Sequence, residues 1–230
     1  GGERLPIDKA TIIVEDNLQD IENKLVPVDG KALSYTMGGL KLVNAQPLVL
    51  EPFSEIHDSR YSIYWLALSN DKYRAYLDSL AALEVEKLAL QTRTVDFVAP
   101  GEQQPEADHF MQKENSNTGN LEDEFWRDAA NEGYFSYQMS TNAEENLTLM
   151  VRYWGAEWGN RKFDILIDDQ RLVSVDNTFK WNQSKFQDVE YAVPNTMVEG
   201  KKQIRLKFQS TTGNSVSSVF YVRLIRNKKQ

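Results

Sequence analysis

The sequence predicts a mainly β protein whose second half is an antiparallel β-sandwich. From about residue 133 onward, short stretches alternate apolar and polar residues with a period of two. This is the pattern of strands that bury one face and wet the other. The stretches follow one another at spacings of about a dozen residues, which is typical of sandwiches. The predicted strands are residues 133–139, 146–153, 162–167, 171–175, 187–193, 203–208 and 219–225.

Residues 3–70 are also predicted to be rich in strands. Short apolar runs at residues 10–14, 25–28, 40–43 and 48–50 are separated by turn residues. Asp29-Gly30 predicts a two-residue hairpin turn, and the alternation in residues 61–65 predicts a further strand.

One long helix is predicted, over residues 71–92. This stretch contains no Gly or Pro, and Tyr73, Tyr76, Leu77 and Leu80 fall at steps of three and four along one face. Ser69, Asn70 or Asp71 is suited to cap its start. We expect a connecting helix between a β-rich segment at residues 3–70 and a sandwich at residues 93–230.

Residues 93–125 are expected to be irregular. Residues 98–101 (VAPG) break the chain, and residues 102–121 are polar with little periodicity. A structureless stretch of this length in a compact domain usually has a function or crosses between sheets.

Composition excludes several classes of function. Lys and Arg total 26 against 34 Asp and Glu, so the net charge is −8, the wrong sign for binding nucleic acid or an anionic membrane. There is no Cys, which removes thiolate chemistry and Cys–zinc sites. The two histidines, His57 and His109, cannot form a multi-histidine metal site. No apolar run approaches the roughly 20 residues of a membrane span.

Two catalytic interpretations are weak. Residues 57–59 (His-Asp-Ser) carry the groups of a catalytic triad, but a triad is defined by geometry, and neighbours in sequence seldom form one. A hydrogen-bonded turn is the simpler interpretation, and His109 is most simply a packing or loop histidine. Paired carboxylates, as glycosidases need, could come from a cluster of acids, although an acid-rich chain supplies many chance pairs. These acids are Glu122, Asp123, Glu124 and Asp128.

Two regions carry a family resemblance. Residues 94–109 (TVDFVAPGEQQPEADH), followed by 115–119 (NSNTG) and 125–128 (FWRD), resemble the C-terminal region of bacterial glycoside hydrolases of family 127, the β-L-arabinofuranosidase group. Residues 51–65 (EPFSEIHDSRYSIYW) resemble the segment after the catalytic barrel in the same proteins.

The resemblance implies a non-catalytic accessory region. Members of that family carry an (α/α) barrel with cysteines and a bound zinc, which this cysteine-free chain cannot reproduce. The start at Gly1-Gly2 without Met also leads us to expect an upstream segment. The implied partner is the parent enzyme's own catalytic barrel, and the implied location is periplasmic or extracellular.

A second resemblance covers residues 104–226, whose strand order is similar to galactose-binding-like jelly rolls, a form shared by many carbohydrate-binding modules. It implies a jelly-roll β-sandwich preceded by a smaller β-rich segment and one connecting helix. Related jelly rolls often hold a structural calcium near the first strand, and hard oxygen ligands occur here. The candidate ligands are Glu102, Glu106, Asp108 and Glu114; the alternative is a solvated acidic loop.

Aromatic residues are the candidate sugar-binding groups. Sugar rings present C–H faces that pack on aromatic rings, while nearby polar groups bind the hydroxyls. Residues 153–159 (YWGAEWG) predict a loop at the end of a strand, where binding residues are often found. The candidates are Trp126, Tyr153, Trp154 and Trp158; the alternative is that they fill the core or pack on the missing barrel.

The sequence therefore predicts an accessory region that buttresses a catalytic barrel and binds plant-type glycans weakly. Two alternatives remain open: a purely structural module without a ligand, and an independent glycosidase.

Overall fold

The computed structural model describes residues 11–14, 21–37, 49–52, 54 and 66–227. It divides into two compact units, Gly1–Glu86 and Lys87–Gln230, and each is described by itself. The boundary falls within helix α2 (Asn70–Arg93).

The N-terminal unit contains two small sheets. Strand β1 (Thr11–Val14) pairs in parallel with β5 (Leu66–Ser69). After the 3₁₀ helix η1 (Ile21–Lys24), strands β2 (Leu25–Pro27), β3 (Tyr35–Met37) and β4 (Val49–Leu50) form an antiparallel sheet in that order.

The predicted two-residue hairpin at Asp29-Gly30 is wrong in its length. The turn itself exists, because Lys31 N donates to Val28 O at 3.2 Å and Gly30 has a φ of 76°. However, Pro27 pairs with Tyr35, so the whole of residues 28–34 connects the two strands. The predicted strand at 61–65, the run at 40–43 and His57 lie outside the described residues.

The predicted connecting helix is confirmed as α2. Its start is capped by the Ser69 hydroxyl, which accepts a hydrogen bond from Lys72 N at 3.4 Å. Near its C-terminal end, Leu90 packs against a small cluster of Met150, Tyr221 and Ile225.

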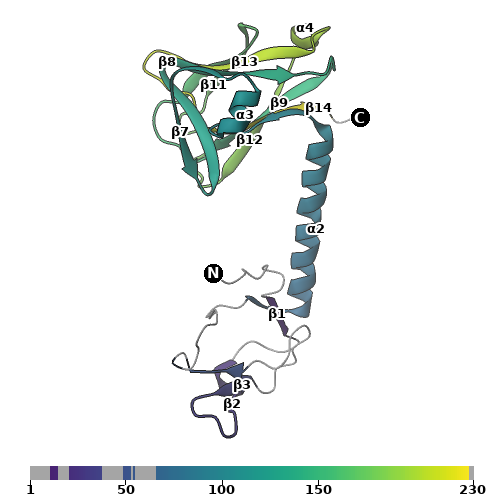
Figure 1. Cartoon of the computed structure of the whole chain (residues 1–230), viewed down its shortest axis with the longest axis vertical. Coiled ribbons are helices and arrows are strands. Elements are labelled where there is room, and N and C mark those ends of the chain that lie inside the picture. The colour runs from purple at the N-terminus through teal and green to yellow at the C-terminus, as the bar shows by residue number, and fades with distance from the viewer. Residues whose placement is uncertain (1–10, 15–20, 38–48, 53, 55–65, 228–230) are drawn as a thin grey trace. The chain divides into compact units, whose positions relative to one another are not determined.

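The C-terminal unit is an antiparallel β-sandwich of jelly-roll type, so the predicted fold class is confirmed (Figure 1). Its strands run in the order β11-β10-β13-β8-β14-β9-β12, with β6 added beside β14 and β7 beside β8. The strands are β6 (Thr94–Val98), β7 (Gln112–Leu121), β8 (Glu124–Ser140), β9 (Leu147–Trp154), β10 (Lys162–Ile167), β11 (Gln170–Asp176), β12 (Phe186–Ala192), β13 (Gln203–Ser210) and β14 (Val219–Arg226). Two short helices, α3 (Gln103–Asp108) and α4 (Asn195–Val198), complete the unit.

The long strand β8 pairs with three strands, β7, β13 and β14. Its later part pairs with β13 over seven residue pairs, whereas its pairing with β14 is the single pair Arg127–Val219. The predicted alternation gives the core: the inward residues of β9 are fully buried at Leu147, Leu149, Val151 and Tyr153. Phe135 of β8 stacks on Phe208 of β13 with 4.9 Å between ring centroids.

The expectation that residues 93–125 are irregular is wrong, because they form β6, α3 and β7. β7 and β8 form a hairpin in which Leu121 pairs with Glu124. Glu122 and Asp123 make the two-residue turn with φ values of 49° and 66°, as a type I′ turn requires. Most β7 side chains are exposed, so the strand carries no apolar alternation by which the sequence could reveal it.

Candidate functional site

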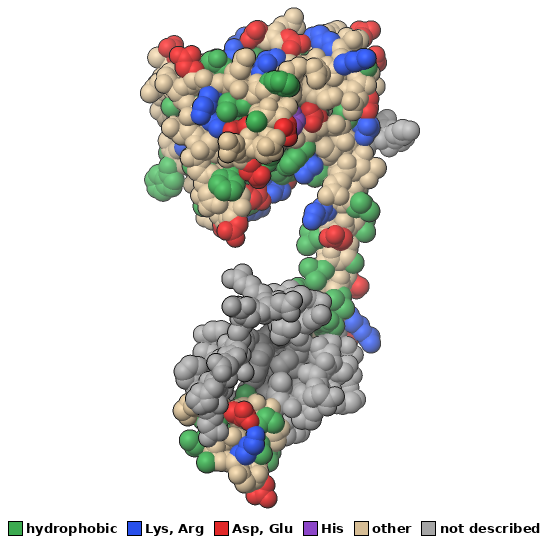
Figure 2. All heavy atoms as spheres, viewed as in Figure 1, with side chains coloured by type: hydrophobic (Ala, Val, Ile, Leu, Met, Phe, Trp, Pro, Cys, Tyr) green, Lys and Arg blue, Asp and Glu red, His purple; other side chains and the backbone are tan. Residues whose placement is uncertain are grey.

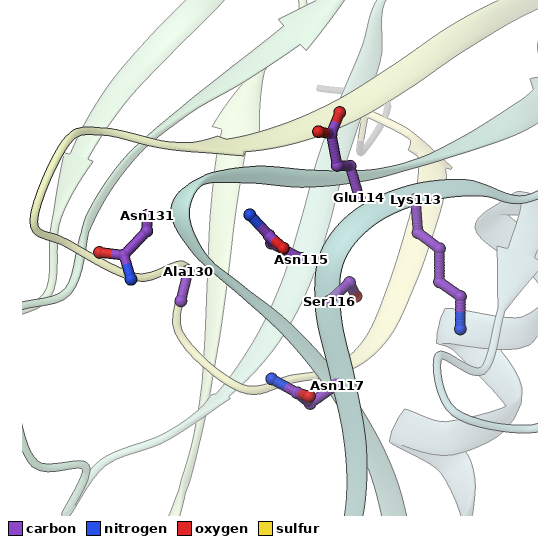
Figure 3. Close-up of a pocket in the computed structure, with 7 residues that line it drawn as sticks. All are labelled: Lys113, Glu114, Asn115, Ser116, Asn117, Ala130 and Asn131. Carbon is purple, nitrogen blue, oxygen red and sulfur yellow. The ribbon is translucent and has the colours of Figure 1, made fainter.

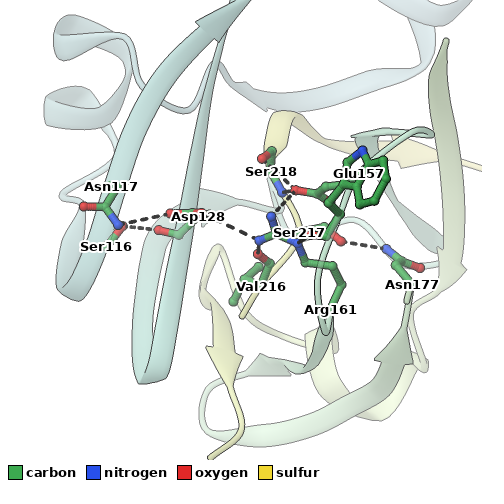
Figure 4. Close-up of polar contacts among 10 residues, drawn as sticks. Ser116, Asn117, Asp128, Glu157, Arg161, Asn177, Val216, Ser217 and Ser218 are labelled. Carbon is green, nitrogen blue, oxygen red and sulfur yellow. Dashed lines mark hydrogen bonds and ion pairs between the residues drawn. The ribbon is translucent and has the colours of Figure 1, made fainter. Parts of the chain in front are cut away.

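Three loops and one strand meet at one end of the sandwich (Figure 4). The loops are residues 155–161, 177–185 and 211–218, and the strand is the early part of β8 around Asp128. Backbone hydrogen bonds tie the loops together: Asn177 N donates to Arg161 O at 2.9 Å, and Ser215 N donates to Asn160 O at 3.0 Å.

Arg161 is the centre of this loop cluster. Its Nε donates to Trp158 O and its Nη1 to Val216 O, each at 3.0 Å. Its guanidinium also lies 3.3 Å from Glu157 and 3.7 Å from Asp128 (Figure 4). One cation therefore joins two loops to strand β8, which fixes the loop that carries Trp158.

Glu157 is a nearly buried carboxylate, with a side chain 10% exposed. The backbone N–H and the hydroxyl of Ser218 both donate to its Oε1 at 2.7 Å. Burial raises the pKa of the Glu157 carboxyl above its usual value, although Arg161 and Ser218 favour the ionised form and offset part of this effect.

Replacing Glu157 with glutamine should make the variant gain stability relative to the wild type as the pH rises. Because the pKa of Glu157 is higher folded than unfolded, the stability linked to its proton is present below the unfolded pKa of about 4.5 and is lost as pH rises through the folded pKa. Glutamine mimics the protonated carboxyl at every pH. Urea unfolding at about pH 4 and about pH 7.5 should show the relative gain at the higher pH, and the exposed control Glu145→Gln should not. An equal shift of both variants would contradict the assignment.

Two large aromatic side chains stand exposed on the loop cluster. Trp158 is 82% exposed, and Phe179 of the adjacent loop is 52% exposed. The loops are joined next to these rings, because Arg161 N donates to Thr178 Oγ1 at 3.0 Å. Phe179 has a φ of 50°, a backbone conformation that a bulky residue seldom adopts and that concentrates at functional sites.

A pocket of about 450 Å³ lies where β7 and β8 bend (Figure 3). Its lining includes the amide side chains of three asparagines. The full set is Lys113, Glu114, Asn115, Ser116, Asn117, Ala130 and Asn131. Asn115 and Asn131 have φ values of 44° and 49°. The pocket adjoins the loop cluster, because Ser116 Oγ donates to Asp128 O at 2.6 Å and Asn117 Nδ2 lies 3.5 Å from Asp128 Oδ1.

The predicted aromatic residues have different environments. Trp158 is exposed as a sugar platform requires, and Trp154 is half-buried on the outer face of β9 with its ring edge on Phe186 at 5.2 Å. Trp126 lies in the β7–β8 hairpin over Gly119, where an added Cβ would come within 2.3 Å of its ring.

Tyr153 is not a sugar platform, which corrects the prediction. It is fully buried, its ring stacks on Trp181, and its hydroxyl contacts the Tyr191 hydroxyl at 3.2 Å. Strand alternation points it into the core, where no ligand can reach the ring.

The four predicted calcium ligands do not assemble into a metal site. Within the described residues, no three acidic or histidine side chains are close enough to share a metal. Glu106 is buried and its carboxylate is occupied by Arg127, whose Nε and Nη2 donate to its two oxygens at 2.5 and 2.6 Å. A guanidinium thus supplies the positive charge. Glu102 and Glu114 are exposed, and Asp108 accepts from Gln104.

His109 is held in a polar pair that the sequence did not reveal. Its ring nitrogens contact Pro105 O at 2.7 Å and Asp96 Oδ1 at 3.1 Å. Both partners are acceptors, so the protonated ring satisfies both contacts, and the hydrogen bond to Asp96 raises the pKa of His109. The residues are 13 apart in sequence, and no motif links them.

The fold and site define a β-sandwich module with a braced cluster of loops at one end. The chain belongs to a family described as "Family of unknown function (DUF6805)", whose model matches residues 89–225. A second model, "Domain of unknown function" (DUF4986), matches residues 1–67. None of the curated proteins matches the chain.

Several solved structures are similar to about half of the chain. A family 35 carbohydrate-binding module from Clostridium thermocellum has 13% identity and a TM-score of 0.39, covering 51% of this chain and 92% of its own. The CBM35 of Abf62 from Cellvibrio japonicus has 12% identity, a TM-score of 0.41 and coverage of 57% and 93%. The CBM36-1 domain of a xylanase from the hindgut metagenome of Trinervitermes trinervoides has 15% identity, a TM-score of 0.39 and coverage of 58% and 98%.

The described helices include none long and apolar enough to cross a membrane. On the face shown in Figure 2, acidic and basic side chains are interspersed over the sandwich, and apolar groups are scattered among them.

Proposed function

We propose that the C-terminal unit is a non-catalytic carbohydrate-binding module whose ligand packs on Trp158 and Phe179. The observation that carries this proposal is the 82% exposure of the Trp158 side chain on a loop braced by Arg161. Exposing an indole to water is unfavourable. An indole held exposed on a braced loop contributes favourable packing only when a ligand covers it.

The chemistry around these rings suits a sugar. The negative face of an aromatic ring attracts the polarised C–H groups of a sugar face, and adjacent polar side chains bind its hydroxyls. The loop cluster and the neighbouring amide pocket supply such groups at Asp128, Asn115 and Asn117. Because the loops are already tied by backbone hydrogen bonds, little ordering entropy opposes binding.

The alternative of an independent glycosidase has less support. A glycosidase needs two carboxyl groups facing one substrate, one of them able to donate a proton. Here Glu124 pairs with Arg152 at 3.0 Å, and Glu157 and Asp128 both face Arg161. The acids of the loop cluster therefore brace loops, which favours binding over hydrolysis.

We also propose that the module is an accessory region of a family-127-like glycoside hydrolase. What supports this is the resemblance of residues 51–65 to the segment after the barrel in that family, and of residues 94–109, 115–119 and 125–128 to its C-terminal region. The role would be to buttress the barrel and to hold it on plant-type glycans outside the cytoplasm. Arabinan-type glycans are therefore the first ligands to test.

Replacing Trp158 with alanine should weaken glycan binding at least about tenfold, because an exposed aromatic anchor would be lost. Isothermal titration of the full chain with arabino-oligosaccharides, after a glycan-array screen, measures this. Trp158→Phe should retain part of the affinity. The matched control is Phe125→Ala, which removes a ring that is 46% exposed outside these loops. Undiminished binding by a folded Trp158→Ala protein would contradict the proposal, and an array without any bound glycan would favour the purely structural module.

A further inference from the structure

A second cavity lies beside α3, away from the Trp158 loops. Its volume is about 460 Å³, within the range of pockets that hold small ligands. Its lining includes the apolar residues Ala107, Phe110 and Met111, and also Lys113 and the Glu106–Arg127 pair. None of its lining residues belongs to the three loops around Arg161, although Lys113 also lines the amide pocket and Arg127 is the neighbour of Asp128 in β8.

Phe110 is an exposed ring on a fixed backbone. Its side chain is 65% exposed, yet its N–H donates to Ala107 O at 3.0 Å and its carbonyl accepts from Arg205 Nη1 at 2.9 Å. Its φ of 48° is in the left-handed region, which is unfavourable for a bulky residue. Met111 N also donates to Glu106 O at 3.0 Å, so Phe110 is the left-handed residue of a Schellman motif that ends α3, and this motif fixes its backbone.

The polar lining of the cavity is held by an ion pair and carries one further positive charge, that of Lys113. Glu106 and Arg127 satisfy each other through two short hydrogen bonds, and Tyr137 and Gly101 N also donate to Glu106. The side chain of Lys113 is exposed, and its ammonium group makes no hydrogen bond or ion pair with the residues that the structure describes. Its ammonium group is therefore available to donate to a ligand hydroxyl.

We propose that this cavity is a second sugar-binding site, which takes one ring of a neutral glycan against Phe110 with a hydroxyl near Lys113. The ligand class rests on the proposed function, but the site shares no residue with the Trp158 platform. An aromatic platform with adjacent donors matches the general composition of sugar pockets. Binding to both sites would let one module hold two chains, or two parts of one chain, with increased avidity.

The test is the stoichiometry of binding, measured by isothermal titration of short arabino-oligosaccharides into the full chain. The wild type should bind two ligands, whereas Phe110→Ala and Trp158→Ala should each bind one and the double variant none. The conservative variant Phe110→Trp should still bind two ligands. Because Phe110 is exposed, its replacement should leave the thermal unfolding midpoint almost unchanged, which shows that the variant is folded.

The outcomes separate the two proposals. A wild type that binds one ligand, lost with Trp158→Ala and unaffected by Phe110→Ala, overturns the second site and leaves the first. If the wild type binds one ligand and only Phe110→Ala abolishes that binding, the Trp158 site is overturned and the cavity is supported. Retention of two ligands by Phe110→Ala overturns the cavity, and a wild type that binds no glycan overturns both.

Discussion

Replacing Glu106 with glutamine should lower the free energy of unfolding of the C-terminal unit by about 3–5 kcal/mol. The Glu106 and Arg127 side chains are only 6% and 3% exposed, and their two hydrogen bonds measure 2.5 and 2.6 Å. Glutamine removes the negative charge and leaves the Arg127 guanidinium buried without compensation. The loss should be large because desolvation of a single buried charge is not repaid.

Urea unfolding at neutral pH measures this loss, with the exposed neighbour Glu102→Gln as the control that should change stability by less than about 0.5 kcal/mol. The double variant Glu106→Leu/Arg127→Met should be more stable than Glu106→Gln, because it removes both charges. Equal stabilities of Glu106→Gln and Glu102→Gln would contradict the assignment.

The contribution of the Glu106–Arg127 pair to stability should also be lost at low pH. Burial alone would raise the pKa of Glu106, but hydrogen bonds from Arg127, Gly101 and Tyr137 outweigh it, so the pKa is lowered. Because the folded-state pKa is below the unfolded one, the stabilisation is present above about pH 4.5 and is lost as pH falls through the folded value. The contribution of Glu106 to the free energy of unfolding therefore increases with pH, whereas that of Glu157 decreases with pH.

Replacing Arg161 with alanine should cost about 2 kcal/mol of stability and also weaken glycan binding. The cost is smaller than at Glu106 because the Arg161 side chain is 17% exposed and solvent screens its charge. The variant loses the bonds to Trp158 O and Val216 O and leaves Glu157 without its cation. Without Arg161 the loop that carries Trp158 is less ordered, so ordering it on binding costs entropy and lowers the affinity for glycan.

Urea unfolding and glycan titration together check this prediction. The control is Arg171→Ala, whose side chain is 65% exposed and pairs with Asp164 at 3.6 Å; it should change neither property measurably. Loss of stability with unchanged glycan affinity would separate Arg161 from the site.

Sequence reasoning predicted the apolar strands of the sandwich, although β9 and β14 bury residues on both faces, at 147–151 and 219–222. β9, β13 and β14 carry a period-two alternation that depends only on local residue type, and α2 has uninterrupted helix-forming residues. β7 was missed because its side chains face solvent and its pairing with β8 is a tertiary fact. Similarly, the Asp29-Gly30 turn was recognised, but its connection was not, since strand register depends on the partner strand.

Candidate site residues were harder to predict for the same reason. Trp158 was identified from its glycine-flanked loop, but Tyr153, five residues earlier, is buried because it falls on the inward phase of β9. That phase was readable from Leu147, Leu149 and Val151. Phe179 gave no local signal, because its exposure and its positive φ are set by the fold. Glu106 seemed a metal ligand until the structure placed Arg127, 21 residues later, against it.

The most direct test is acrylamide quenching of tryptophan fluorescence with and without a saturating arabino-oligosaccharide. Trp158 is 82% exposed, so among the tryptophans that the structure describes it should contribute most to the quenchable signal. The account predicts that ligand markedly reduces quenching in the wild type and leaves it unchanged in Trp158→Phe. A ligand that binds the wild type with full affinity while its quenching stays the same would show that Trp158 does not contact sugar, contradicting the proposed site.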